Sequence, residues 1–197
     1  VSYLGYLAGA AASWNAATLL DEIDLPAMLD RFAFFDTAGV MGQAAYDLGN
    51  VYRLAGVEPS NASALFLLLL NPERAIDGGW GAELSEDGLG NVLDVLGDIQ
   101  DRIAEADMAR GDAEMVKDEF TWAADMLAWG ARLGIARLEH GALDTAVSLP
   151  AQVRAELARD MRGLIERHRA LWLRRSRPGG LEDSAGRLER VVDVLEA

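Results

Sequence analysis

Apolar residues recur at the spacing of an α-helix along most of this chain. A first stripe follows Asp24 and Pro26, residue types that favour an N-cap and the first turn of a helix. A second stripe begins after Asp36 and closes at Gly56, a residue type suited to a helix C-terminus. Residues 62–70 are apolar on every side, as is typical of a central helix. The pattern therefore predicts three short helices before residue 71.

Four longer stripes follow. They cover residues 89–103, 112–140, 150–177 and 181–195, and the last two are separated by a Pro-Gly-Gly break. The stripe from Asp112 has two apolar faces, so neighbours are expected on both sides of that helix. Together the elements predict an all-α fold, an antiparallel bundle of about seven helices.

Residues 1–20 differ from the rest because they carry no charge and follow no clear period. Val1–Leu7 has the composition of one buried strand, and an apolar N-terminal helix fits the same residues. A lone strand cannot satisfy its edges, so a strand here would need neighbours from outside this chain or from another copy. Both alternatives remain open from the sequence.

Residues 71–90 interrupt the helical pattern with one proline and five glycines. A loop of about twenty residues is long for a compact domain, which indicates either mobility or function. Trp80 lies within it. An indole in such a loop can contact a sugar or a partner protein, and it can equally fold back as a plug on the core.

The charge of the chain narrows the classes of partner that it can bind. The 197 residues carry a formal net charge of −14, which argues against nucleic acid and anionic membranes as partners. From Pro150 onward the balance is +2, so the remainder carries −16. The arginine-rich end is expected either to be a solvated face or to pack against acidic helices of its own chain or of a partner. Polar residues interrupt the uncharged start and no basic residues flank it, so we expect neither a membrane span nor a secretory signal but a cytoplasmic protein.

No residue combination predicts catalysis. The adjacent acids Asp21–Glu22 and Asp118–Glu119 would point about 100° apart on a helix and could not converge on one bond. The chain has no cysteine, and its histidines, His140 and His168, lack metal-ligand spacing, so no metal and no cofactor are expected. His168 lies on an apolar stripe, which favours a hydrogen-bonded core histidine.

The ending Arg169–Ser184 reads R-A-L-W-L-R-R-S-R-P-G-G-L-E-D-S and resembles the C-terminal end of bacterial family 20 glycoside hydrolases. The typical ending of that family has the form Y-R-x-L-W-L-x-x-N-R-P-x-G-L. In this chain His168 stands in place of the Tyr and Ser176 in place of the Asn. Residues 23–26, 36–41 and 46–50 are similar to the start of the family's helical domain.

The family consists of β-N-acetylhexosaminidases in which a catalytic (β/α)8 barrel precedes a helical domain. The resemblance implies that residues 1–20 are the last barrel strand and its connection, and that residues 21–197 are the helical domain. It also implies that Trp14, with Asn15 beside it, contacts the sugar. The acid that often follows that Trp by two residues is Ala16 here, so this contact would be missing.

The family's catalytic Asp-Glu pair lies on an earlier barrel strand, which this chain does not contain. The resemblance therefore implies a domain that is inactive alone and supports the barrel or dimerisation. Its partners would be the barrel of the same parent protein and a second copy, with a carbohydrate ligand only in the intact enzyme. Two other hypotheses remain: a stand-alone helical interaction module without catalytic activity, and a ligand-binding bundle with its pocket near Trp80, Trp122 and Trp129.

Overall fold

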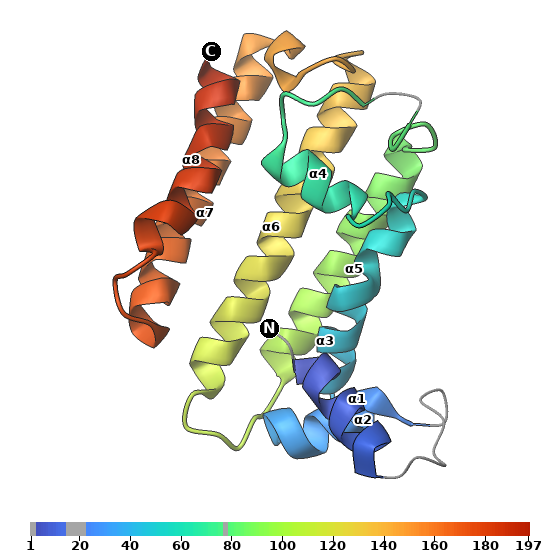
Figure 1. Ribbon diagram of the computed structural model, residues 1–197, viewed down its shortest axis with the longest axis vertical. Helices are drawn as coiled ribbons and strands as arrows, with labels where there is room; N and C mark the ends of the chain where they lie inside the picture. Colours follow the sequence, from blue (N-terminus) through green and yellow to red (C-terminus); the bar gives the residue numbers. More distant parts are fainter. Residues whose placement is uncertain (1–2, 15–22, 77–78) are drawn as a thin grey trace. The chain divides into compact units, whose positions relative to one another are not determined.

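The computed structural model describes residues 3–14, 23–76 and 79–197, and it confirms the all-α prediction. Figure 1 shows the order of the elements. The α-helices are α1 (Tyr3–Trp14), α2 (Leu25–Leu29), α3 (Met41–Asn50), α4 (Ala64–Leu70), α5 (Glu86–Glu105), α6 (Ala113–Glu139), α7 (Ala151–Arg175) and α8 (Leu181–Glu196). A π-helical turn, η2 (Asp30–Phe34), and two 3-10 turns, η3 (Val51–Ala55) and η4 (Ala146–Ser148), join them.

The first element decides between the two alternatives that the sequence leaves open. Tyr3–Trp14 is a helix, so the expected barrel strand is wrong for these residues. Within the described ranges the only extended pairing is a single antiparallel bridge between Asp36 and Met108. A helix satisfies its own backbone groups, whereas a strand at this end would have had no neighbour in the chain.

The contacts divide the chain into two compact units. Unit 1 consists of residues 1–50 and 97–121, and unit 2 consists of residues 51–96 and 122–197. The division falls inside two helices, because α5 and α6 each give residues to both units.

Unit 1 is built on the close approach of α2 and α3. The predicted N-cap forms, since the Asp24 carboxylate accepts a hydrogen bond from the backbone N–H of Ala27 at 3.0 Å. A side chain at Gly42 would place its Cβ 2.0 Å from the carbonyl oxygen of Pro26, so only glycine permits this crossing. The N–H of Gly42 donates to the Asp30 carboxylate at 2.5 Å. Burial raises the pKa of Asp30 above its usual value.

Asp36 connects the start of α3 to the segment after α5. One carboxylate oxygen accepts the N–H groups of Val40 and Met41 at 2.8 and 2.9 Å, so Asp36 satisfies two backbone donors at the start of α3. The other oxygen accepts the N–H groups of Ala38 at 3.3 Å and Asp107 at 2.6 Å. Burial raises the pKa of Asp36, but these four donors outweigh burial and leave the pKa below its usual value.

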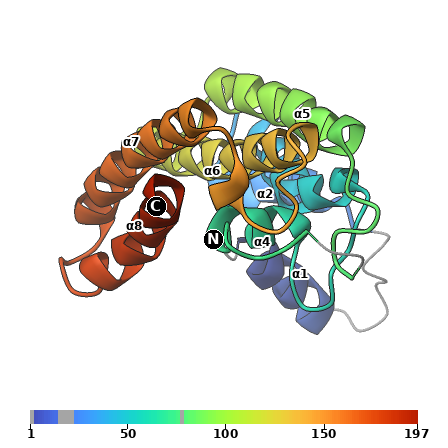
Figure 2. The same cartoon turned by 90° about the horizontal axis from the view of Figure 1, so that it is seen from above.

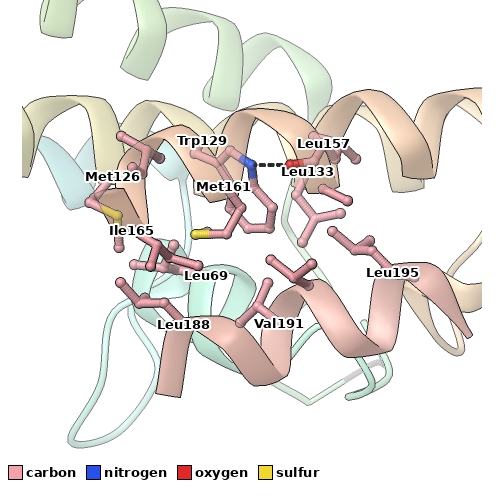
Figure 3. Packing of buried hydrophobic residues seen from close by; sticks show 14 of the residues in the cluster. Leu69, Met126, Trp129, Leu133, Leu157, Met161, Ile165, Leu188, Val191 and Leu195 are labelled. Atoms are coloured by element: carbon pink, nitrogen blue, oxygen red, sulfur yellow. Dashed lines mark hydrogen bonds between the residues drawn. The ribbon is translucent and has the colours of Figure 1, made fainter. Parts of the chain in front are cut away.

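Unit 2 has one large apolar core. Figure 3 shows side chains from α4, α6, α7 and α8 meeting there, with Trp129 and Met161 among them. The indole N–H of Trp129 donates to the carbonyl of Leu157 at 3.0 Å, so the largest buried side chain has its polar atom satisfied. In both ribbon views α8 lies along α7 (Figures 1 and 2), and apolar side chains of both helices meet in this core.

The arginine-rich ending reverses direction between α7 and α8, and its arginines form ion pairs within the chain. Gly180 adopts a φ of 82°, and Leu181 donates its N–H to the carbonyl of Pro178, so the chain reverses direction. Arg169 of α7 donates to Glu182 through Nη1 and Nη2 and to Glu189 of α8 through Nη2, at 2.7 to 2.9 Å. Further pairs join Arg162 to Glu196 and Arg167 to Asp125. Three arginines of the basic end thus face acidic groups of their own chain.

Candidate functional site

The loop after α4 is fixed to the bundle at several points. It is shorter than the sequence predicts, because α5 begins at Glu86 rather than near Leu89. The N–H of Ala146 donates to the carbonyl of Pro72 at 2.9 Å, and the N–H of Ile76 donates to the carbonyl of Leu143 at 2.7 Å. Before residue 77 the loop is therefore held by the segment that follows α6.

A buried arginine adds a third attachment. Arg137, in the last turn of α6, is 0% exposed. Its guanidinium donates to the carbonyl of Arg74 at 2.9 Å, and to those of Ala142 at 2.9 Å and Leu143 at 2.8 Å. Burial lowers the pKa of Arg137, and the charge of Asp144 opposes this effect. Burying a cation costs free energy, and the hydrogen bonds to these three carbonyls offset part of that cost. The same bonds join the loop after α4 to the segment after α6.

Residues of this loop and of the segment before α4 line a cavity of about 650 Å³. One wall is the indole of Trp80, whose N–H donates to the carbonyl of Ala75 at 2.9 Å. The guanidinium of Arg74 lies over the same ring, 5.7 Å from its centroid. The cavity is lined by Val57, Glu58, Pro59, Ser60, Ala62, Leu67, Arg74, Gly79, Trp80, Ala82 and Glu83. Trp80 is half-buried, so it packs on its own loop and also presents a surface to the cavity.

Of the two other residues expected to contact sugar, the structure describes one. Trp14 ends α1 and is 92% exposed. Asn15 lies outside the residues that the structure describes. Within unit 2, Trp122 and Trp129 do not line the cavity at Trp80, because they donate their indole N–H groups to carbonyls of α7. The expected pocket shared by Trp80, Trp122 and Trp129 is therefore not formed.

His168 has the surroundings of a structural histidine, as the sequence favours. Its ring stacks on Trp122 at 5.0 Å and meets the edge of Trp172 at 5.8 Å. Its Nε2 lies 3.0 Å from the hydroxyl of Ser184. A serine and a histidine at this distance could act as nucleophile and base. However, burial and the charge of Arg169 lower the pKa of His168 and disfavour the imidazolium that base catalysis would form.

A second hollow of about 710 Å³ lies between α4 and α8. Phe66 of α4 is half-exposed and lines it with Leu70 and Asn71. The other side is α8, through Gly186 and four charged side chains. One of these, Glu182, is already bound by Arg169. Like the cavity at Trp80, this hollow has an aromatic side chain in its lining.

The remaining expectations concern metal ligands, membrane spans and the adjacent acids. Among residues 3–14, 23–76 and 79–197, no group of three or more His, Asp or Glu side chains is arranged to hold a metal ion. No helix in those ranges has both the length and the apolarity to cross a membrane. Of the adjacent acids, Asp21–Glu22 lies outside the described residues, and Asp118–Glu119 lies on α6.

Sequence reasoning missed Arg137, although a signal for it existed. The residue continues the apolar face of α6 at helical spacing, four residues after Leu133 and eight after Trp129. A charged residue on such a face indicates a buried and bonded group.

Comparison with known proteins adds no identification. No family model matches the chain, and neither a curated protein nor a solved structure does.

Proposed function

We propose that this chain is a helical accessory domain that packs against a catalytic domain and performs no catalysis itself. The observation that carries the proposal is the state of α1. This helix of 12 residues has no charged side chain, and none of its residues is buried. Tyr6 and Trp14 are 80% and 92% exposed, and Phe32 and Phe35 elsewhere in unit 1 are about half-exposed. Exposed apolar side chains on an uncharged helix are typical of a surface that another protein covers.

The resemblance of residues 169–184 to family 20 glycoside hydrolases supplies the nature of the partner. We propose that α1 meets the (β/α)8 barrel of a β-N-acetylhexosaminidase-like parent, which hydrolyses terminal N-acetylhexosamine residues. Trp14 at the end of α1 is exposed and is therefore available for contact with such a partner. This part of the proposal rests on the sequence resemblance.

Two measurements test the enzymatic parent. The coding sequence upstream of the Val1 codon should encode a barrel with an Asp-Glu pair at the end of one strand. The full parent should hydrolyse a chromogenic N-acetylglucosaminide, and the isolated chain should not. An upstream sequence without such a barrel would remove the glycosidase from the proposal.

The packing role of α1 has a separate test. Tyr6→Arg should lower the melting temperature of the full parent, because a covered apolar residue would become a buried charge. The same substitution should leave the melting temperature of the isolated chain unchanged, since Tyr6 is exposed there. Leu173→Arg is the control, because Leu173 is an exposed apolar residue of α7 in unit 2. It tests whether an arginine at any exposed apolar position has the same effect. Equal behaviour of Tyr6→Arg in both proteins would refute the packing role.

The second candidate is a stand-alone dimerisation module, and the same exposed helix favours it. In that case the isolated chain should sediment as a dimer, and Tyr6→Arg should convert it to a monomer. A monomeric isolated chain would exclude this alternative and leave the accessory domain.

A further inference from the structure

We propose that the cavity lined by Trp80, Arg74, Glu58 and Glu83 binds a neutral saccharide. The inference rests on this cavity alone. It requires neither the barrel nor catalysis, so it stands or falls separately from the proposed accessory role.

The wall of the cavity is preorganised. The indole N–H of Trp80 is already bound to Ala75, so the ring is fixed and offers its apolar surface rather than a donor. The carbonyl of Arg74 is held by the buried guanidinium of Arg137, and Ile76 is held by Leu143. A fixed wall reduces the conformational entropy that the protein loses when a ligand binds, which raises affinity.

The charges of the lining select against charged ligands. Glu58 and Glu83 disfavour an anion. The guanidinium of Arg74 stands over the indole, where a cationic ligand would otherwise be attracted to the ring. Arg53 lies 4.0 Å from Glu58 and offsets its charge. With two acids and two arginines close together, a neutral ligand avoids repulsion from either sign.

The remaining chemistry fits a sugar ring. Carboxylates accept hydrogen bonds from hydroxyl groups, and a guanidinium and the Ser60 hydroxyl can donate to ring and hydroxyl oxygens. Arg74 covers one face of the indole, and the flat opposite face suits the apolar C–H face of a pyranose. A cavity of about 650 Å³ is within the range of small-molecule sites and holds one or two sugar rings.

Calorimetric titration of the isolated chain tests the proposal. The neutral probes are cellobiose, maltose and N,N′-diacetylchitobiose, and the charged probes are glucosamine and glucuronate. We expect saturable binding of at least one neutral disaccharide. Trp80→Ala should weaken it by about tenfold, the value of one aromatic contact. Phe66→Ala, in the other hollow, should leave affinity unchanged.

Three results would overturn the proposal. They are no saturable binding of any neutral disaccharide, tighter binding of a charged probe, and an unchanged affinity in Trp80→Ala. Circular dichroism checks that Trp80→Ala folds. If it does not, Glu83→Gln serves instead, since Glu83 is exposed and its substitution leaves the core intact. Unchanged affinity in a folded Glu83→Gln variant would then count against the site.

Discussion

At the scale of single residues, two charged side chains organise the two units by binding backbone groups. Asp36 gathers four N–H groups in unit 1, and Arg137 donates to three carbonyls in unit 2. Both are buried, and each connects segments that are distant in the chain. Substitution of a buried charge bound in this way destabilises the fold, because the backbone groups around it lose their hydrogen-bond partner.

Asp36→Asn should destabilise the protein by about 2 kcal/mol. Each carboxylate oxygen accepts two N–H groups, so an amide in either orientation turns its NH₂ toward two donors. Urea unfolding at neutral pH measures the loss. Asp98→Asn, at an exposed position of α5 in the same unit, is the control and should change little.

The same variant should alter acid sensitivity. The folded pKa of Asp36 is lowered, so its contribution is fully present above the unfolded pKa of about 3.9 and is lost as the pH falls through the folded value. The gap in unfolding free energy between wild type and Asp36→Asn should therefore narrow below about pH 4. A gap that stays constant from neutral to acid pH would contradict the role of the carboxylate charge.

Arg137→Lys should destabilise by about 2 kcal/mol, because an ammonium cannot reproduce the planar fork that reaches three carbonyls. Arg132→Lys is the matched control on the same helix. Its side chain is half-exposed and its ion pair with Asp160 is 4.0 Å long, so the change should be near zero. Thermal unfolding of both variants decides the matter, and equal losses would show that Arg137 has no special role.

At the scale of elements, α3 contains one glycine whose surroundings exclude a methyl side chain and one whose surroundings allow it. In α3, a Cβ at Gly42 would meet the Pro26 carbonyl, whereas a Cβ at Gly49 would meet nothing within 4 Å. Gly42→Ala should cost about 3 kcal/mol through displacement of α2. Gly49→Ala should instead stabilise by up to about 1 kcal/mol, because alanine is the better helix former. Opposite signs in chemical denaturation would confirm the crossing, and a neutral Gly42→Ala would refute it.

Salt bridges between elements help to orient the helices that they join and contribute little to the stability of the fold. The bidentate contact of Arg169 with Glu182 raises the pKa of Arg169 and lowers that of Glu182. Both side chains remain in contact with solvent, which screens such pairs. The apolar core shared by α7 and α8 is therefore the main attachment of the last helix.

At the scale of the whole molecule, net charge should govern the response to salt. A net charge of −14 implies repulsion among acidic groups. Raising sodium chloride from about 0.02 M to about 0.5 M should therefore raise the urea midpoint, because salt screens this repulsion. Repetition with potassium chloride controls for the identity of the cation. A falling midpoint would mean that ion pairs such as Arg169–Glu182 outweigh the repulsion.

The sequence by itself determined the all-α fold and several helix ends. Asp24 capped α2 as predicted, Gly56 took the left-handed conformation after η3 with a φ of 78°, and α8 began at Leu181. These features depend on residues within a few positions of one another, so local preference is enough to predict them. Residues 3–14 could not be decided in this way, because an uncharged stretch without caps or a clear period satisfies both helix and strand.

Only the tertiary structure decided the sites. Asp36 and Asp107 are 71 positions apart, and the Arg74 carbonyl lies 63 positions before the arginine that binds it. Trp80 could be read from the sequence as a plug or as a contact residue, and the structure gives it both a bonded N–H and a place in a cavity wall. Such contacts arise when packing brings distant segments together, and no short-range pattern of residue types specifies them.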